Sequence, residues 1–319
     1  MHDEERQMYE LEYPTPDIRG SQQDGPTLIV ALHGYADAGQ AVEGIAEHLL
    51  AALDNRLLAS FNTDELIDFR SRRPPVTMEE HEIISAAELE LEMRVLRDGQ
   101  GRSFLLLSGP EPDMRWNAFS RAVGELAERY QVARTICLYA APMTVPHTRP
   151  LIVSAHGNSP RLVGDMYRFD GKVVVPGAAA LNIERTLANL GREVAGYTAH
   201  VPHYVAASPY PEAMLNLLRS VASNAQLDLP LRALEQDSRK VAEQLAEQTS
   251  DSAEVRQVVQ ALEEQYDDAV EKYRADNPRA VMPGEAAIPT GEELGEEFER
   301  FLAQIDEQSG GPGEGSSPE

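Results

Sequence analysis

The chain has 319 residues, of which 42% are hydrophobic, so it can build a sizeable core and is neither a peptide nor a disordered chain. Acidic residues outnumber basic ones 53 to 28, and the net charge of −25 disfavours nucleic acid and anionic membranes as partners. The single cysteine, Cys137, lies in an apolar run and cannot form an internal disulfide, as expected in a reducing compartment. No apolar stretch is as long as a membrane span, and the acidic start is unlike a signal peptide, so we expect a cytoplasmic protein.

The first part of the chain has the pattern of an α/β protein, because short apolar runs alternate with amphipathic segments. The continuous apolar run at 27–33 predicts a strand buried on both faces, and the spacing at 40–53 predicts a helix. Apolar and charged residues alternate at 88–95, and a turn at 98–99 leads to an apolar run at 104–107. This pattern predicts one antiparallel hairpin in a sheet that is otherwise parallel.

The following segments continue this alternation up to about residue 228. Helices are predicted at 116–130 and from Pro176-Gly177 to Leu190, and strands at 134–140, 151–155, 172–175 and 193–200. We therefore predict a three-layer α/β sandwich with a mostly parallel sheet.

Beyond residue 230 the apolar spacing becomes helical. Asp251 and Glu254 form a predicted capping box between two helices of a helical hairpin, and Thr290 begins a last amphipathic helix. The acidic residues of this part provide either a docking segment for a basic partner or a solvated face. The predicted organisation is an N-terminal extension (1–24), a sandwich domain (25–228), a helical C-terminal domain (229–306) and a disordered tail (307–319).

Polar loops follow the ends of several predicted strands, which is where open α/β sheets bind ligands. The loop at 33–39 contains glycines that allow a tight turn and close approach to a ligand, although it matches neither the dinucleotide fingerprint nor the P-loop. It is equally compatible with a capped link between strand and helix. With the loops at 108–116, 142–150 and 156–158 it forms a candidate pocket, whose residues are His33, Gly34, Asp37, Gly39, Glu111, Arg115, His147, Arg149, His156, Asn158 and His203.

The motifs of the main enzyme classes are missing from the sequence. A Gly-x-Ser-x-Gly elbow does not occur, and Ser108 and Ser154 at strand ends have no evident base. His200 and His203 leave a strand on opposite sides, which does not suit two ligands of one metal. We therefore assign no catalytic residue, metal or cofactor, and enzymatic activity stays open.

A second candidate site is the charged loop that ends in Pro74-Pro75. Its interface candidates are Asp64, Arg70, Arg72 and Arg73. The planar guanidinium group of arginine matches carboxylates and phosphates. The loop could hold an anionic ligand or join two subunits, or its charges could pair within the chain.

Six motifs in a fixed order stand out in the chain: Gly34-Tyr35-x-Asp37-Ala38-Gly39, Asp64-Glu65-Leu66-x-Asp68-Phe69-Arg70-Ser71-Arg72-Arg73-Pro74, Ser108-Gly109-Pro110-Glu111-Pro112, Pro146-His147-Thr148-Arg149-Pro150, His156-Gly157-Asn158 and His200-Val201-Pro202-His203-Tyr204. Taken together, these motifs resemble the actinobacterial branch of the proteasome assembly chaperone two family. It implies a phosphorylase/hydrolase-like α/β sandwich, a helical C-terminal appendage and self-association as a trimer. It also implies a role in protein assembly by analogy.

Two functional hypotheses follow. The first is a non-enzymatic, homo-oligomeric protein-binding or assembly factor. The second is a hydrolase, a nucleoside-phosphorylase-like enzyme or a ligand sensor that uses the pocket at the strand ends.

Overall fold

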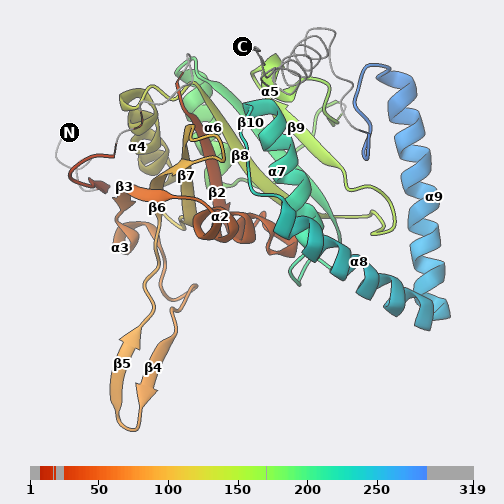
Figure 1. Ribbon diagram of the computed structural model, residues 1–319, viewed down its shortest axis with the longest axis horizontal. Coiled ribbons are helices and arrows are strands. Elements are labelled where there is room, and N and C mark those ends of the chain that lie inside the picture. The colour runs from red at the N-terminus through yellow and green to blue at the C-terminus, as the bar shows by residue number, and fades with distance from the viewer. Residues whose placement is uncertain (1–7, 17, 19–24, 170, 286–319) are drawn as a thin grey trace, which may run out of the picture. The chain divides into compact units, whose positions relative to one another are not determined.

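The computed structural model describes residues 8–16, 18, 25–169 and 171–285 (Figure 1). Residues up to Pro283 form one compact unit. In this described part, eight strands form one sheet in the order β1-β3-β6-β7-β2-β8-β10-β9. The strands are β1 (Tyr9–Leu11), β2 (Thr27–His33), β3 (Asn55–Phe61), β6 (Glu92–Arg97), β7 (Ser103–Pro110), β8 (Arg134–Met143), β9 (Val153–Gly157) and β10 (Glu193–Pro202).

The centre of the sheet is parallel and its margins are antiparallel. Strands β7, β2, β8 and β10 lie side by side and run in one direction, and β3 shares that direction. Strands β1, β6 and β9 run the opposite way. The parallel strands therefore end at one common edge, which we call the carboxyl edge; it contains His33, Pro110, Met143 and Pro202.

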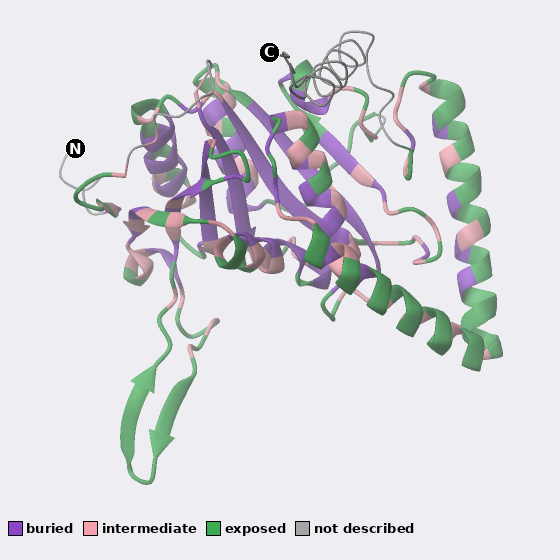
Figure 2. Ribbon diagram, viewed as in Figure 1, coloured by how far each residue is buried: buried purple, intermediate pink, exposed green. Residues whose placement is uncertain are grey.

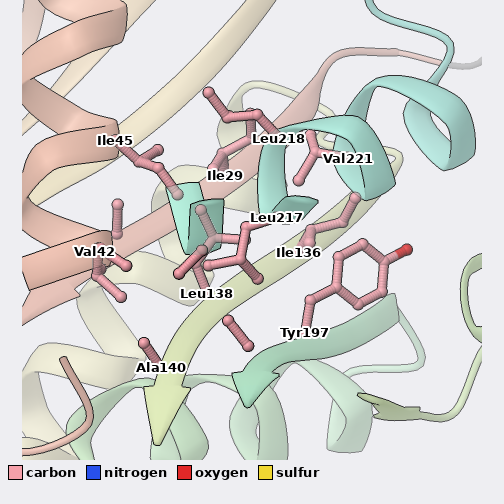
Figure 3. Close-up of a cluster of buried hydrophobic side chains, with 14 of the residues drawn as sticks. Ile29, Val42, Ile45, Ile136, Leu138, Ala140, Tyr197, Leu217, Leu218 and Val221 are labelled. Atoms are coloured by element: carbon pink, nitrogen blue, oxygen red, sulfur yellow. The ribbon is translucent and has the colours of Figure 1, made fainter. Parts of the chain in front are cut away.

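Helices cover both faces of the sheet. Helices α2 (Ala41–Ala52) and α7 (Pro211–Ala225) pack on one face, and α4 (Trp116–Arg129) and α6 (Ala179–Asn189) pack on the other. Neighbouring residues of one strand point to opposite faces, so Ile29 belongs to the first core and Leu28 to the second. Figure 3 shows Ile29, Ile136 and Leu138 of the first core beneath helices α2 and α7.

The predicted α/β sandwich is confirmed, and so is the antiparallel hairpin, which is formed by β6 and β7. Antiparallel pairing extends further than expected, because β1, β3 and β9 also pair in this way. The strand predicted at 172–175 is wrong: this segment is not a strand, and Val173, Val174 and Val175 are exposed. Its β-branched residues have no neighbouring strand in the sheet with which to pair.

A second, two-stranded sheet was not predicted. Strands β4 (Val76–Glu79) and β5 (Glu82–Ala86) form an antiparallel hairpin after the short helix α3 (Thr63–Leu66). Every residue of both strands is exposed. Figures 1 and 2 show the hairpin projecting away from the sandwich, coloured as exposed along its whole length.

The C-terminal helices are α8 (Arg232–Asp251) and α9 (Ala253–Asp276). The predicted capping box is wrong by one residue, because Ser252 caps α9 by accepting a hydrogen bond from the Val255 amide at 3.3 Å. The two helices meet at a corner in Figure 1 and do not pack along their length as a helical hairpin would. Helix α9 instead contacts the loop that follows β8.

Three sequence predictions concern segments at the ends of the chain. The last amphipathic helix from Thr290 and the tail at 307–319 lie outside the described residues. Part of the predicted extension at 1–24 contributes strand β1, and Met8 beside it is buried. The division into a sandwich domain and a separate helical domain stays a prediction.

Candidate functional site

Glu111 connects three segments at the carboxyl edge. It follows β7 and is buried, with an exposed fraction of only 8%. Its Oε1 atom accepts a hydrogen bond of 2.6 Å from the Ala179 amide at the start of α6, and its Oε2 atom accepts one of 3.5 Å from the Tyr35 amide. The Glu111 amide donates to the His33 carbonyl at 2.8 Å. A carboxylate at a helix N-terminus satisfies a free amide and interacts favourably with the helix dipole, so Glu111 holds this edge together.

The predicted interface loop is attached to the same edge. The Arg72 guanidinium lies 3.4 Å from the Asp113 carboxylate, and Arg115 forms an ion pair with Glu65. The amide of Asp113 donates to the Leu66 carbonyl at 2.9 Å, so the base of the β4–β5 hairpin lies beside the end of β7. The other three interface candidates, Asp64, Arg70 and Arg73, are exposed.

The predicted pocket residues of the 33–39 loop mostly build the link between β2 and α2. Asp37 accepts hydrogen bonds from the amides of Val42 at 2.6 Å and Glu43 at 3.2 Å, and burial raises the pKa of its carboxyl. Gly39 has φ +71°, and a Cβ atom there would lie 2.8 Å from Tyr210 Cβ. Only glycine suits this close approach and positive φ. His33 lies 3.7 Å from the Glu43 carboxylate.

Gly34 lies directly beside Glu111. A Cβ atom at position 34 would lie 3.0 Å from both Cβ and Oε2 of Glu111. Gly34 and Glu111 therefore pack tightly. Contacts of Glu111 and its neighbours bring together the segments of four predicted pocket residues, His33, Gly34, Glu111 and Arg115.

A second group of predicted residues lines a cleft of about 470 Å³ between the sandwich and the C-terminal helices. His147, His203 and Tyr204 form its polar wall, and the opposite wall is formed by Leu245, Gln248, Thr249, Glu254, Val255, Val258 and Val259. The Tyr204 hydroxyl accepts from the His147 amide at 2.8 Å and hydrogen-bonds with His147 Nδ1 at 2.7 Å. Burial lowers the pKa of His147, although the nearby Glu263 carboxylate opposes this shift.

Arg149, the neighbour of this group, fixes helix α9. Its guanidinium makes two hydrogen bonds of 2.8 Å to the Asp267 carboxylate and lies 3.1 Å from Glu263. These bonds raise the pKa of Arg149 and lower that of Asp267. Arg149 is therefore occupied by structural contacts and does not point to a ligand.

His156 and Asn158 do not join the other predicted residues. Strand β9 is antiparallel to β10, and Gly157 is opposite Ala195 near the start of β10. The end of β9 therefore lies away from the carboxyl edge, which the sequence could not show because it does not reveal strand direction. Asn158 bonds only to backbone, donating to the Arg192 carbonyl and accepting from the Val194 amide, both at 2.9 Å.

His156 belongs to a cluster that sequence reasoning missed. Its Nε2 atom donates to Glu184 Oε2 at 3.0 Å, and the Tyr139 hydroxyl donates to Glu184 Oε1 at 2.6 Å. The hydrogen bond with Glu184 raises the pKa of His156, although burial opposes this shift. Glu184 lies within a predicted helix, and nothing in its spacing marked it as a polar residue facing the sheet.

One serine in the structure does have a histidine partner. His200 Nε2 lies 2.9 Å from Ser154 Oγ, both residues are buried, and burial lowers the pKa of His200 to about 4. The rings of Tyr167 and Phe169 pack against the imidazole at 6.0 and 5.4 Å. The pair therefore forms an internal hydrogen bond between two buried side chains.

Within residues 8–16, 18, 25–169 and 171–285, no three His, Cys, Asp or Glu side chains group as metal ligands would. Among the same residues, no helix has the length and apolar character needed to cross a membrane.

Comparison with known proteins gives a consistent result. The family profile of the PAC2 family matches residues 31–249. A crystal structure of a protein of unknown function from Corynebacterium glutamicum is 58% identical, with a TM-score of 0.82, and the match covers 84% of this chain and all of that one. A PAC2 family protein from Streptomyces avermitilis is 27% identical over 73% of this chain and 99% of its own, with a TM-score of 0.64.

A more distant structure shares the fold. A proteasome-assembly chaperone homologue from Mycobacterium tuberculosis is 24% identical, with a TM-score of 0.66, over 73% of this chain and 99% of its own. No curated protein matches the chain.

Proposed function

Because the chain belongs to the PAC2 family, we propose that it is a homo-oligomeric protein-binding factor with an assembly-chaperone-like role. The name of a relative, a proteasome-assembly chaperone homologue, supports a role in binding other proteins. We further propose that the chain self-associates, catalyses no reaction and is located in the cytoplasm.

The β4–β5 hairpin is the observation that carries the proposal. It exposes four large apolar side chains, Val76, Met78, Ile83 and Ile84, to solvent. Two strands alone are marginally stable in water, and exposed apolar surface on a projecting element is typical of a protein-binding surface. An enzyme pocket does not require a projecting apolar hairpin. A protein that binds other chains can use such a hairpin as a contact surface.

The carboxyl edge supports the same function. Tyr35, Phe69 and Met114 are exposed aromatic or apolar side chains in the three loops at this edge, and Arg70 and Arg73 lie exposed beside them. Aromatic residues and arginine are enriched at protein interfaces. We propose that this edge, including the interface loop, binds the protein that is being assembled.

The name of the relative from Mycobacterium tuberculosis refers to proteasome assembly, so we propose proteasome subunits as the partner class. The test is to mix the purified full chain with separately purified, unassembled proteasome subunits of its own organism and to follow ring formation by native mass spectrometry. We expect a complex with unassembled subunits and a change in the rate of ring formation. An unchanged rate and no complex would exclude this partner class.

A second candidate function rests on the cleft lined by His147 and Tyr204. A mostly apolar cleft with a few polar groups is the usual form of a small-molecule site. Native mass spectrometry of the purified protein tests this function: a bound small molecule should be lost in Val258→Trp, which fills the cleft, and retained in Val174→Trp, which changes an exposed valine elsewhere. A ligand-free wild type would count against the cleft as a site.

A further inference from the structure

A polar pocket lies at the edge of the sheet that is opposite the carboxyl edge. It has a volume of about 330 Å³ and is lined by Pro16, Asp54, Asn55, Arg56, Val95 and Arg97. Asp54 to Arg56 lie where β3 begins, and Val95 and Arg97 lie where β6 ends. These two strands are antiparallel neighbours in the sheet (Figure 1). The pocket is therefore built on the adjoining ends of two strands, away from the loops of the carboxyl edge.

The strand register brings two arginines to one face of the sheet. Arg56 is opposite Val95, and the Arg97 amide donates to the Asp54 carbonyl at 3.1 Å, which continues the same pairing. Residues two positions apart along a strand lie on one face, so Arg56 and Arg97 are diagonal neighbours, about 7–8 Å apart. Val95 on that face is buried in the second core. Two guanidinium groups from neighbouring strands can therefore reach one ligand beside Val95.

Both guanidinium groups are available to a ligand. Arg56 and Arg97 are exposed, and neither takes part in an ion pair or a side-chain hydrogen bond with the described residues. Arg94 of β6 is the contrast, because it is bonded to Glu92 at 2.7 Å and to Asn55 Oδ1 at 3.0 Å. Acidic residues outnumber basic ones 53 to 28 in the whole chain, yet Asp54 is the one acidic residue among those that line this pocket. The pocket is therefore suited to an anion.

The arrangement fits a phosphate group better than a carboxylate. One arginine can bind both oxygens of a carboxylate, whereas a phosphomonoester offers three acceptor oxygens and a charge of about −1.5 to −2 at pH 7. Two guanidinium groups supply enough donors and charge for such a group. They also outweigh the single opposing charge of Asp54. The site therefore favours an anion that engages both arginines at once.

The pocket also limits the size of its ligand. Its volume lies near the lower end of the range of about 300–1,000 Å³ that small-molecule sites occupy. Pro16 and Val95 provide apolar contact for the uncharged part of a ligand. A nucleic acid does not suit the site, because a chain with a net charge of −25 repels a long polyanion. The remaining class is a small phosphorylated compound.

We propose that this pocket, which we call the arginine pocket, binds the phosphate group of a small phosphorylated metabolite. Arg56 and Arg97 hold the phosphate oxygens, and the rest of the ligand lies against Val95 and Pro16. The bound ligand joins β3, β6 and the N-terminal segment, so it stabilises the folded protein. The arginine pocket is separate from the proposed protein-binding surface at the carboxyl edge, and the two proposals stand independently.

The test is titration calorimetry of the full chain at low salt, with glycerol 3-phosphate, inorganic phosphate and succinate as the probes. We expect both phosphate compounds to bind, glycerol 3-phosphate more tightly, and succinate to bind much more weakly than either. Arg56→Gln and Arg97→Gln should each weaken phosphate binding roughly tenfold, because each removes charge-assisted hydrogen bonds. Arg232→Gln, a change at an exposed arginine at the start of α8, is the matched control and should leave the affinity unchanged.

Asp54 provides a test with the opposite sign. Its carboxylate lines the pocket and opposes an anion, so Asp54→Asn should bind the phosphate compounds about threefold more tightly at low salt. The difference between Asp54→Asn and the wild type should shrink as salt is added, because the charges are exposed to solvent. A pocket residue with only a structural role would not raise the affinity when it is replaced.

Each result decides for or against the arginine pocket. A wild type that binds neither phosphate compound overturns the proposal. Phosphate binding that survives in both Arg56→Gln and Arg97→Gln overturns it too, because the phosphate then lies elsewhere. Succinate that binds as tightly as glycerol 3-phosphate overturns the phosphate assignment. Urea unfolding of the two arginine variants should match the wild type, so that a loss of binding is separated from a loss of folding.

Discussion

Glu111 Oε1 accepts a 2.6 Å hydrogen bond from the Ala179 amide, although the two residues are 68 positions apart in the chain. This bond joins the end of β7 to the start of α6, and the second oxygen of the same carboxylate reaches the Tyr35 amide. The loops that carry exposed apolar residues at the carboxyl edge are therefore held by one buried side chain, and the rigidity of the proposed binding edge depends on it.

Replacement of Glu111 by alanine should destabilise the protein. It leaves the buried amide of Ala179 without a partner, which costs about 1–3 kcal/mol. Glu111→Gln keeps an acceptor of the same shape and should cost less. Urea unfolding measures both, with the exposed Glu88→Ala as the control. Equal stability of Glu111→Ala and Glu88→Ala would mean that the bond does not hold the edge.

The two arginines of the interface loop should behave differently. Arg72 is paired with Asp113 and lies near Glu111, so Arg72→Glu places like charges together and should lower stability by roughly 1 kcal/mol. Arg73 is exposed, so Arg73→Glu should weaken binding of a protein partner without changing the urea midpoint. Titration calorimetry and urea unfolding distinguish the two effects. Normal partner binding by Arg73→Glu would remove Arg73 from the interface.

Arg149 should control the attachment of helix α9. Its ion pairs with Asp267 and Glu263 are partly exposed, so Arg149→Ala should cost only about 1 kcal/mol, and less at high salt. Hydrogen exchange should become faster in α9 and stay unchanged in α4. Lys272→Ala, a change at an exposed lysine of the same helix, provides the matched control. Equal exchange in the two variants would show that Arg149 does not fix α9.

Stability should fall in acid because of His200. Its pKa is about 4 in the folded protein, against 6.5 for an unperturbed histidine, so only the unfolded chain binds the proton between these values. The contribution is complete above pH 6.5 and is lost as the pH falls towards 4, by up to about 3 kcal/mol. His200→Phe should flatten the dependence of the unfolding free energy on pH in this window. His81→Gln, at the exposed hairpin turn, should retain it.

The sequence predicted best those elements whose apolar residues follow a single clear period. The buried run at 27–33 and the helical spacing at 116–130 predicted β2 and α4 closely, because strands covered on both sides and amphipathic helices have distinct periods. The β4–β5 hairpin was missed, since its fully exposed strands have no buried face within the chain. A strand was wrongly predicted at Val173 to Val175, because a run of β-branched residues does not reveal whether a neighbouring strand exists.

The candidate site was predicted only in part, because the sequence does not reveal the direction of each strand. Residues that follow parallel strands, such as His33 and Glu111, were placed at one edge by topology alone. His156 was placed there too, but β9 is antiparallel and takes it elsewhere. The cleft at His147 could not be predicted, because it depends on where α9 packs. Helix α9 is held by hydrogen bonds between Arg149 and Asp267 and between Tyr266 and Pro150, and the partners of each bond are more than a hundred residues apart in the chain.

The most direct test of the account is the molar mass of the full chain in solution, measured by sedimentation velocity. The account predicts an oligomer for the wild type, a single chain for Met78→Glu with Ile83→Glu, which places charges at two exposed apolar positions of the β4–β5 hairpin, and an intact oligomer for Thr77→Glu with Ser85→Glu at two polar positions of the same hairpin. A wild type that sediments as a single chain at every concentration, or an oligomer that Met78→Glu with Ile83→Glu leaves intact, would contradict it.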